Sequence, residues 1–416
     1  MKILVLGAGV IGVTTAYQLL KDGHEVAVVE QRESAGEETS AGNAGLIAPG
    51  HAFAWASPAA PKILLKSLFQ EGQALRFRLR PDPRLWAWSL KFLRQCTVER
   101  ARINTLRKHR LCRYSQELLH QVVAETGVAY DGLDGGLLYL YRDPANFEHA
   151  AVKTRLLAEA GQEIETIDTA RAIEIDPALA PAKDKLAGAI YCPTDESGDS
   201  RLFTRGLAKV CEGLGGRFHY RTTIRRLVLD GDRVEKVLTD RGAFSADAYV
   251  LSLGCDSPIL ARQLGIKLPI YPIKGYSVTI PVTPANRERA PRIGGVDEDN
   301  LVAYVRMGER LRITATAEFA GYDLSHQPSD FRHMLAAARD LFPEGCAFDR
   351  PSYRACLRPM TPQGTPIFGL GRQRNLYFNT GHGHMGWTMA NGAARIAADL
   401  IAGRKPAIDL TGMTLR

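Results

Sequence analysis

The first thirty residues combine apolar runs with glycine. Residues 3–6 form a short continuous apolar run, which is typical of a strand buried on both faces of a sheet. Apolar side chains then recur at helical spacing between residues 11 and 21, and Gly23 marks the helix stop. The segment EVAVVE at residues 25–30, which is apolar over 26–29, predicts a second strand. The pattern predicts a strand, a glycine turn, a helix and a second strand, which together make one βαβ unit.

The rest of the chain mixes helical and strand-like patterns. The predicted elements are helices over 63–113, 145–160 and 200–213, a meander of short strands over 217–253, more strands over 266–320, a strand at 375–379 and a helix over 388–402. Strand–glycine–helix units near both ends enclose strand-rich segments. The order predicts a mixed α/β and α+β fold, in which a Rossmann-like nucleotide-binding domain is interleaved with a second domain built on an antiparallel sheet with helices.

The first glycine turn has the spacing of a dinucleotide-binding fingerprint. GAGVIG at residues 7–12 fits G-x-G-x-x-G between a strand and a helix. Gly7 permits the tight turn, Gly9 lets the backbone approach a pyrophosphate, and Gly12 lets the helix pack on the strand. Glu30 ends the second strand, where a carboxylate accepts hydrogen bonds from an adenosine ribose. The motif predicts a bound dinucleotide without separating FAD from NAD.

Two further segments favour an extended dinucleotide, and therefore FAD. Residues 39–45 (TSAGNAG) form a loop of small, hydroxyl and amide side chains suited to wrapping a ligand with backbone amides. Residues 381–388 (GHGHMGWT) repeat the glycine–helix arrangement, and a helix N-terminus there can stabilise negative charge on a reduced flavin. Besides the fingerprint glycines and Glu30, the candidate cofactor-binding residues are Val10, Ile11, Gln31, Ser40, Asn43, Ala44, Gly45, Leu46, Ile224, Leu253, Gly254, Gly383, His384, Met385, Gly386, Trp387 and Thr388.

Composition narrows the class of protein. Hydrophobic residues make up 45% and charged residues 24%, as in an ordinary soluble globular protein, and no apolar run approaches the ~20 residues that span a bilayer. The apolar run after Lys2 leads straight into the glycine turn, so we interpret it as a strand and not as a secretion signal. The seven cysteines are scattered without a CxxC pair, which predicts neither a disulfide framework nor a metal site and favours a reducing, cytoplasmic compartment.

The net charge of +8 is concentrated in one segment. Residues 62–113 hold fourteen Lys or Arg and three Asp or Glu, whereas the rest of the chain has a small acidic excess. No RNA-module signature accompanies them, so nucleic acid is not the expected partner. In residues 84–94, Arg84, Lys91 and Arg94 share one helical face beside tryptophans, an arrangement that can lie on the anionic inner face of a plasma membrane. The segment is the candidate for peripheral membrane contact, with a helix packed on the second domain as the alternative.

Five blocks of sequence carry a family resemblance. They are ETSAGNAGLIAPG (38–50), YPIKGYSVTIP (271–281), RLRITATAEFAGYD (310–323), RPMTPQGTPIFG (358–369) and NTGHGHMGWTMANG (379–392). In this order they resemble the blocks of bacterial D-amino acid dehydrogenases, within the superfamily of D-amino acid oxidase, glycine oxidase and sarcosine oxidase. The resemblance implies FAD held without a covalent bond and a substrate sheet over the flavin face. We expect an FAD-binding domain made of residues 1–56, 190–265 and 352–416, and a substrate-binding domain made of 57–189 and 266–351.

The resemblance also implies a reaction. It is the oxidative deamination of a small D-amino acid to a 2-oxo acid and ammonia, with hydride transfer from the α-carbon to flavin N5 and electrons passed to a quinone or another carrier. The D-configuration comes from the resemblance alone. No side-chain base is required if the amine arrives neutral, so we expect the protein to act mainly by orientation and electrostatics.

An arginine is the natural clamp for the substrate carboxylate, because its planar fork meets a carboxylate bidentately. The resemblance places Arg306 in this role, and Arg358 is a candidate second anchor. The other candidate catalytic residues are Tyr276 and Tyr304 as hydroxyl donors to the carboxylate, His382 as a contact of the flavin or the amine, and His51 at the mouth of the pocket.

Other hypotheses on the substrate and the role of the chain stay open at this point. The substrate can instead be a secondary amine such as sarcosine, D-proline or a hydroxy-D-proline, because pocket shape decides this preference. The chain can also be a flavin-carrying electron-relay subunit of a larger complex. A nucleotide-binding regulator without redox chemistry is disfavoured, because it would leave the second glycine turn without a purpose.

Overall fold

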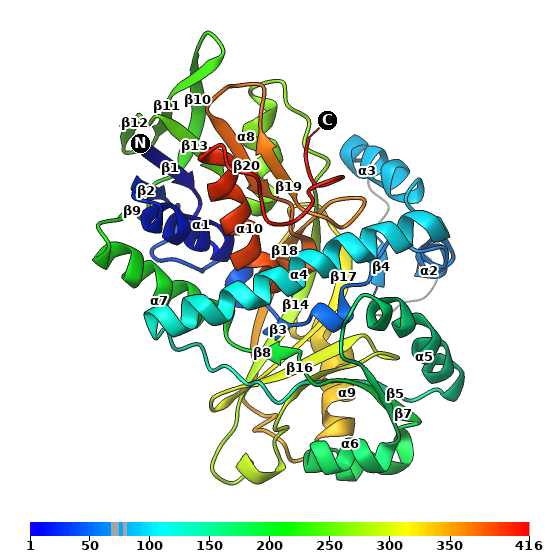
Figure 1. Cartoon of the computed structure of the whole chain (residues 1–416). Helices are drawn as coiled ribbons and strands as arrows, with labels where there is room; N and C mark the ends of the chain where they lie inside the picture. The colour runs from blue at the N-terminus through cyan, green and yellow to red at the C-terminus, as the bar shows by residue number, and fades with distance from the viewer. Residues whose placement is uncertain (68–74, 78–80, 416) are drawn as a thin grey trace.

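The computed structural model describes residues 1–67, 75–77 and 81–415, and within them two sheets organise the chain (Figure 1). The first, called the parallel sheet below, pairs in parallel except at β19. Its strands come from near both ends and from the middle of the chain, so the expected interleaved α/β architecture is confirmed. In spatial order they are β19 (Ile367–Leu370), β20 (Leu376–Thr380), β13 (Ala248–Leu251), β1 (Lys2–Leu6), β2 (Glu25–Val29) and β9 (Arg217–His219).

Side-chain alternation along β1 divides the core around the parallel sheet. Ile3 and Val5 pack against helices on one face, whereas Leu4 and Leu6 pack on the other face. Because both faces are covered, the strand is a continuous apolar run in the sequence. The first face carries α1 (Val10–Lys21), α4 (Val98–Thr126), α7 (Ser200–Gly213) and α10 (Gly386–Ile401), and the second carries α8 (Ser257–Arg262) and the antiparallel sheet of β10 (Ile224–Asp230), β11 (Arg233–Thr239) and β12 (Gly242–Phe244).

The second sheet, called the large sheet below, is mostly antiparallel. One face packs on α6 (Thr169–Ile175), η3 (Pro177–Lys185) and α9 (Arg332–Leu341). The other face turns toward α3 (Pro83–Leu93), α5 (Pro144–Glu159) and the loop 39–55. Its strands are β18 (Ser352–Met360), β14 (Tyr271–Pro281), β17 (Arg310–Phe319), β16 (Val302–Met307), β15 (Gly294–Asp297), β5 (Leu137–Tyr141), β7 (Gly188–Cys192) and β6 (Glu165–Ile167), with β4 (Leu75–Phe77) beside β17.

The helix α4 joins the two halves of the molecule. The side chain of its N-cap residue Thr97 accepts a hydrogen bond from the Arg100 amide, and Gly127 ends the helix in the left-handed region at φ 64°. Figure 1 shows α4 crossing from the side of α3 toward α7, and it packs on α10 along the way. Polar groups of α4 therefore reach both the loop 39–55 and the C-terminal end of the chain.

Most of the predicted elements are confirmed, including the helices at 145–160 and 200–213 as α5 and α7. The helical run expected over 63–113 is confirmed for α2 (Ala60–Ser67), α3 and the start of α4, and it is wrong at β4. There, hydrogen bonding to β17 decides the conformation of three residues that have no strong local pattern. Residues 68–74 and 78–80 of that run lie outside the described residues.

The strand pairing bears on the expected domain boundaries without deciding them. The strands of the parallel sheet all lie in the segments expected to bind FAD. However, β18 begins the segment 352–416 and is hydrogen-bonded into the large sheet, and β7 spans the boundary at residue 190. The division into two domains stays a prediction.

Two findings concern the expectations from composition. Across residues 1–67, 75–77 and 81–415, no helix combines the length and the apolar character needed to cross a membrane. All seven cysteines are free thiols, and five of them are buried. The remaining short elements are β3 (Leu46–Ile47), β8 (Glu196–Ser197), η1 (Thr39–Gly42), η2 (Pro49–His51), η4 (Gly254–Asp256), η5 (Arg287–Arg289), η6 (Pro328–Phe331) and η7 (Gly383–Met385).

Candidate active site

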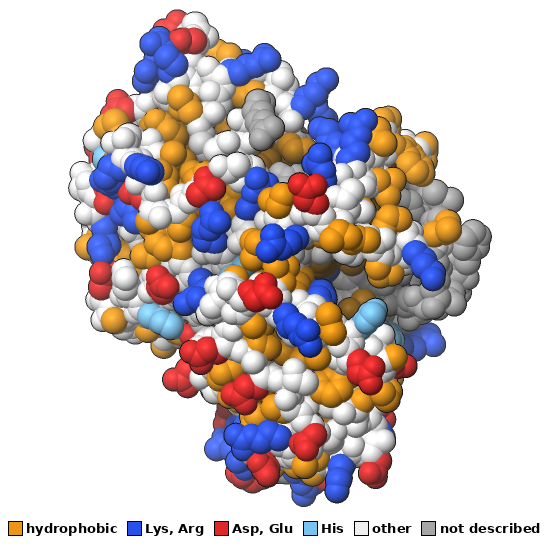
Figure 2. Space-filling view, turned by 45° about the vertical axis from the view of Figure 1, so that its right-hand side comes forward, with side chains coloured by type: hydrophobic (Ala, Val, Ile, Leu, Met, Phe, Trp, Pro, Cys, Tyr) orange, Lys and Arg blue, Asp and Glu red, His pale blue; other side chains and the backbone are white. Residues whose placement is uncertain are grey.

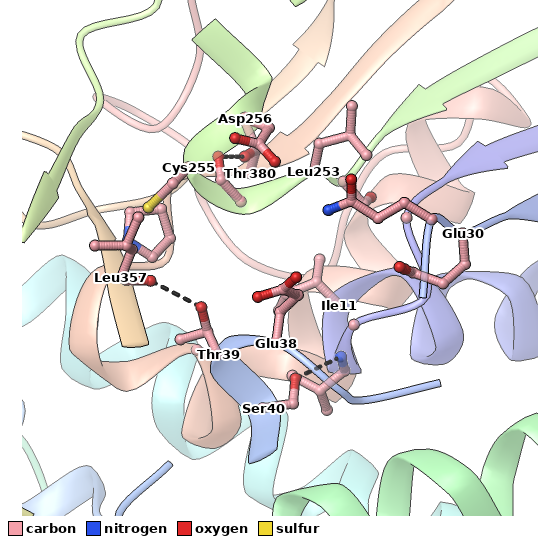
Figure 3. Close-up of a pocket in the computed structure, with 18 of the residues that line it drawn as sticks. Ile11, Glu30, Glu38, Thr39, Ser40, Leu253, Cys255, Asp256, Leu357 and Thr380 are labelled. Carbon is pink, nitrogen blue, oxygen red and sulfur yellow. Dashed lines mark hydrogen bonds between the residues drawn. The ribbon is translucent and has the colours of Figure 1, made fainter. Parts of the chain in front are cut away.

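A pocket of about 520 Å³ lies at the carboxyl ends of the central strands of the parallel sheet (Figure 3). Gly7 follows β1, Glu30 follows β2, Ser252 follows β13 and Thr380 ends β20, and all four line the pocket. In open α/β sheets, ligands bind in the crevice outside these strand ends. Leu357 of the large sheet closes the pocket from the opposite side, and its carbonyl oxygen accepts a 2.8 Å hydrogen bond from Thr39 Oγ1.

The glycine turn after β1 forms one wall of the pocket. Gly7 has φ 100°, and a Cβ added at Gly12 would collide with the Gly7 carbonyl oxygen. Gly9 faces open space. Apart from its neighbours in the chain, the described residues would offer an added Cβ one contact within 4 Å, with Ser40 Oγ at 3.7 Å. Gly9 supplies no side-chain cap to α1, and the Val10 amide donates instead to Ser40 Oγ at 3.0 Å. The turn therefore offers helix amides and room for a ligand close to the backbone.

Glu30 fixes the shape of this turn. Its Oε2 accepts a hydrogen bond from the Ala8 amide and its Oε1 accepts one from the Arg32 amide, each at 2.8 Å. Burial raises the pKa of the Glu30 carboxyl, and the two backbone donors partly offset that rise. Besides being available to a ribose, the carboxylate is thus part of the scaffold of the turn.

Several buried polar atoms of the pocket lack a hydrogen-bond partner within the described chain. Ser200 Oγ, Ser252 Oγ, His382 Nε2 and Trp387 Nε1 are all in this class and all belong to pocket-lining residues. Because buried polar groups are normally satisfied, a set of orphans around one pocket indicates a polar ligand. Burial lowers the pKa of His382 to about 3, so its ring is neutral at physiological pH.

Most of the predicted cofactor-binding residues come together in the pocket. Ala44, Gly45 and Leu46 do not line it; a Cβ at Gly45 would collide with Met307 of the large sheet, and the Leu46 side chain lies near Gly294. Gly12 acts through helix packing, Met385 is in the core, and Thr388 Oγ1 donates to the Leu46 carbonyl at 3.2 Å. The predicted residues that line the pocket are Gly7, Gly9, Val10, Ile11, Glu30, Gln31, Ser40, Asn43, Ile224, Leu253, Gly254, His382, Gly383, Gly386 and Trp387.

Comparison with known proteins identifies the family. A family model described as FAD dependent oxidoreductase matches residues 2–400. The chain belongs to this family of FAD dependent oxidoreductases. It is 48% identical over 414 residues to D-amino acid dehydrogenase 2 of Mesorhizobium japonicum, covering 99% of each chain. It is also 48% identical over 414 residues to a D-amino acid dehydrogenase of Paramagnetospirillum magneticum, covering 99% of this chain and 98% of the relative.

A solved structure agrees with the fold. Glycine oxidase from Bacillus cereus superposes with a TM-score of 0.75 at 20% identity, covering 97% of this chain and 96% of that chain. The resemblance to D-amino acid dehydrogenases and the FAD-binding architecture are thus confirmed. The orphaned donors and acceptors of the pocket fit FAD, which carries a pyrophosphate, two sugar-like chains and a polar flavin ring.

Arg358 lies beside this pocket, on the face of the large sheet that turns toward the loop 39–55. It is placed between the pocket-lining residues Leu357 and Pro359, and a Cβ added at Gly275 would collide with its guanidinium. Burial lowers the pKa of Arg358 to about 10, and its Nη1 donates to the Thr316 carbonyl at 2.7 Å. No carboxylate among the described residues forms an ion pair with it.

Lys108 and His384 lie near Arg358. Lys108 is 1% exposed and donates to the Phe53 carbonyl at 2.7 Å, and burial lowers its pKa to about 8. The His384 ring stacks on Trp55 at 4.6 Å, and its pKa falls through burial and the nearby charges of Lys108 and Arg358. His384 is therefore neutral. We call the two cations Lys108 and Arg358 the interior cation cluster.

The other predicted catalytic residues lie elsewhere. Arg306 is on the same face of β16 as Tyr304, which packs in the core beside α9, and its guanidinium donates to the carbonyls of Gly308 and Arg287. The Tyr304 ring packs on Phe342. Tyr276 also faces that core, where its hydroxyl donates to Glu318. The structure brings none of the three predicted residues to the pocket.

His51 is held at the edge of the interior region by a polar network. Its Nε2 lies 2.7 Å from Glu298 Oε1, and its ring stacks on Tyr139 at 4.7 Å. Asp195, which is fully buried, accepts hydrogen bonds from the Tyr139 hydroxyl at 2.7 Å and the Gly50 amide at 2.9 Å. Burial raises the pKa of Asp195 to about 7. The network fixes the segment 50–53 that carries both His51 and the Lys108 acceptor.

Sequence reasoning missed several groups of this site. Lys108 gave no signal, because one lysine in a strongly basic helical segment does not stand out as buried. Trp55 follows an Ala- and Pro-rich stretch without periodicity. The pocket-lining side chains of Thr39, Cys255 and Thr380 adjoin motifs that were recognised, and their proximity to glycine turns could have indicated them.

We expect Gly12→Ala and Gly9→Ala to differ in their effects on stability and on flavin content. The Gly12 change places a methyl group against the Gly7 carbonyl, which costs roughly 3 kcal/mol or more and lowers both Tm and flavin content. The Gly9 change meets no protein atom closer than 3.7 Å, so it leaves the fold intact and lowers only flavin content. Thermal unfolding and the 450 nm absorbance of purified protein measure both effects. A Gly12→Ala protein with wild-type Tm would contradict the packing argument.

The raised pKa of Asp195 predicts a pH dependence. A carboxyl whose folded pKa exceeds its unfolded value stabilises the protein at low pH, and this stabilisation is lost as pH rises from about 4 through about 7. Asp195→Asn keeps an acceptor for Tyr139 and removes the titration. The Tm of the variant relative to wild type should therefore increase between pH 5 and pH 8. Equal slopes for the two proteins would show that Asp195 is ionised throughout this range.

Proposed function

We propose that this chain oxidises the C–N bond of a small D-amino acid, giving a 2-oxo acid and ammonia. The observation that carries the proposal is Arg358, a half-buried guanidinium beside the pocket that forms no ion pair with a carboxylate of the described residues. The relatives of 48% identity are D-amino acid dehydrogenases, and this supports both the D-configuration and the reaction class. Their name also favours transfer of electrons to a carrier over direct reaction with oxygen.

Arg358 replaces Arg306 as the proposed carboxylate clamp. Among the described residues, the half-buried Arg358 guanidinium donates to the Thr316 carbonyl alone, so it keeps other N–H groups for a bidentate partner. Gly275 permits this placement because it leaves the surface of β14 open beneath the guanidinium. Arg306, in contrast, has its donors directed to carbonyls of its own hairpin and of Arg287.

The interior cation cluster also selects the protonation state of the substrate amine. A substrate ammonium would lie near Arg358 and Lys108, and like charges at short range in a desolvated site repel strongly. The neutral amine avoids this cost, and its free lone pair is what C–N oxidation requires. His384 is neutral, since burial and the neighbouring cations lower its pKa, and it can position the amine by hydrogen bonding.

FAD, when bound, supplies the two-electron acceptor for this oxidation. We propose that it is held without a covalent bond. Cys255 and His382 line the pocket, but burial raises the thiol pKa of Cys255 well above its ordinary value, which leaves the thiol a poor nucleophile. Acid precipitation of the protein should release all of the flavin into the supernatant.

Anaerobic bleaching of the bound flavin near 450 nm tests the function. We expect bleaching by one group of D-amino acids and none by their L-enantiomers. Arg358→Ala should weaken apparent substrate binding about 100-fold, because it removes a buried charge pair. Arg306→Ala, which removes the same group at an exposed hairpin, should stay within about threefold of wild type.

Other outcomes of this test are informative. Preferential bleaching by sarcosine or D-proline analogues would shift the substrate to a secondary amine. Flavin that stays oxidised with every amine would reject the function and favour an electron-relay subunit. Equal losses in the two arginine variants would reject Arg358 as the clamp.

We propose that electrons leave to a quinone at a membrane surface, through contact made by α3. Leu85, Trp88 and Phe92 bury one side of α3 against the large sheet. The other side exposes Trp86 (49%), Leu90 (53%) and Leu93 (46%), which lie at i, i+4 and i+7. Figure 2, which brings this side of the molecule forward, shows Lys and Arg side chains next to hydrophobic ones in its upper right part. Apolar side chains flanked by basic ones suit an anionic lipid surface.

Vesicle sedimentation tests this contact. Wild-type protein should bind phosphatidylglycerol vesicles and not phosphatidylcholine vesicles, and Trp86→Glu with Leu90→Glu should weaken binding roughly tenfold or more. Leu214→Glu with Leu229→Glu, at exposed positions on α7's end and β10, serves as the control and should bind as wild type. Equal binding by both double variants would exclude α3 as the contact.

A further inference from the structure

A second hollow, of about 390 Å³, lies away from the dinucleotide pocket, between α3, α4 and the C-terminal end of the chain. In Figure 1 the C-terminus lies beside α3, on the same side of the molecule as the N-terminal half of α4. The segment before β14 and the segment 363–367 complete its walls. Its lining residues are Lys91, Gln95, Arg100, Asn104, Arg107, Lys267, Pro269, Gln363, Ile367, Gly412, Thr414 and Leu415. We call this hollow the basic pocket.

The charge in the basic pocket is of one sign. Lys91, Arg100, Arg107 and Lys267 contribute four cations, and no Asp or Glu lines the hollow. Across residues 1–67, 75–77 and 81–415, none of the four forms an ion pair with a carboxylate. Cations gathered without counter-ions repel each other, so the arrangement costs free energy that a bound anion would return.

Helical spacing brings these groups together. Arg100, Asn104 and Arg107 follow one another at i, i+4 and i+7 along α4 and therefore share one face of that helix. Lys91 lies in the last turn of α3, and Gln95 lies in the turn that follows α3. Side chains from the two segments meet across one hollow, which distinguishes it from scattered surface charge.

The floor of the pocket is a hydrogen-bonded network. Asn104 is 2% exposed, and its Nδ2 donates to Gln95 Oε1 at 3.2 Å. Arg107 Nη1 donates to Asn104 Oδ1 at 3.5 Å. The network joins α3 to α4, so the polar groups are ordered before any ligand arrives.

The C-terminal segment holds Arg107 from the other side. A Cβ added at Gly412 would collide with the Arg107 guanidinium, and Gly412 has φ 77°, a region that favours glycine. The guanidinium is therefore confined between α4 and this segment. Arg107 also lines the hollow.

We propose that the basic pocket binds a phosphate group, either of a free phosphate compound or of a lipid headgroup. Four cations exceed what a single carboxylate neutralises, whereas a phosphate carries up to two charges and several strong acceptor oxygens. Two arginines and two amides provide planar donors that match those oxygens. The hollow is larger than phosphate alone, so the ligand is a phosphate ester. The inference is independent of the amino-acid reaction, since it concerns other residues.

Calorimetric titration of the flavin-loaded full chain with sn-glycerol 3-phosphate tests the site, and phosphatidylglycerol vesicles form the second arm. Arg100→Gln with Arg107→Gln should weaken binding tenfold or more in at least one arm. Arg102→Gln with Arg226→Gln removes the same charge at exposed positions outside the pocket and should leave binding within about twofold. Saturable glycerol phosphate binding that the arginine variant loses identifies a free phosphate compound as the ligand. Vesicle binding that the arginine variant weakens, without glycerol phosphate binding, identifies a lipid headgroup.

Two results would overturn the proposal. One is an equal loss of ligand binding in both double variants, which would show that binding depends on the net charge of the protein and not on the basic pocket. The other is the absence of pocket-dependent binding in both arms. If the arginine variant does not fold, Lys91→Gln with Lys267→Gln repeats the test at two exposed side chains of the same pocket. Flavin bleaching by amino acids, measured on the same variants, should be unchanged, so failure here is separable from failure of the proposed reaction.

Discussion

At Gly12 the backbone of α1 comes so close to the carbonyl of Gly7 that no side chain fits between them. This contact sets the start of α1 directly at the carboxyl end of β1, and the pocket opens there. The second glycine turn is then attached to the first through α1. Asn379 Nδ2 donates to Thr15 Oγ1 at 2.9 Å, and Thr14 Oγ1 donates to the Ala390 carbonyl at 3.2 Å. Turns from opposite ends of the chain thus face one ligand because both are built against the same helix.

The electrostatics of the site depend on two cations that are removed from solvent without a carboxylate partner among the described residues. Arg358 and Lys108 both have a lowered pKa through desolvation, and neither is paired with a carboxylate in the described residues. Leaving buried cations uncompensated destabilises the protein, and such strain is retained where a ligand relieves it. In the reaction proposed above, a substrate carboxylate relieves this strain at Arg358, and the remaining positive potential favours a neutral amine. The proposed binding and activation of the substrate therefore depend on the same unpaired cations.

The sequence was informative where a residue type is required by its own backbone. Gly7 at φ 100° and Gly383 at φ 60° occupy conformations that favour glycine, and the β1 run is apolar because both its faces are covered. The face of a strand is different, because a shift by one residue reverses every side chain. The family resemblance placed Arg306 at the substrate without giving the face of its strand. Arg306, Tyr276 and Tyr304 lie on the α9 side, whereas Arg358 has the opposite orientation. Lys108 could not be predicted because its burial depends on contact between α4 and the segment 50–55.

Part of the excess of positive charge in residues 62–113 is explained by the position of α4 between two regions of the molecule. Lys108 Nζ donates to the Phe53 carbonyl, and Thr105 Oγ1 accepts a hydrogen bond from the Ala54 amide at 3.0 Å. Both side chains therefore face the segment 50–55. Asn104 and Arg107, which alternate with them along the helix, line the basic pocket. Neighbouring turns of one helix thus supply cations to the substrate region and to the proposed phosphate site. A helix that serves both regions must be polar on two faces, and for this reason its sequence lacks the single apolar stripe of an ordinary surface helix.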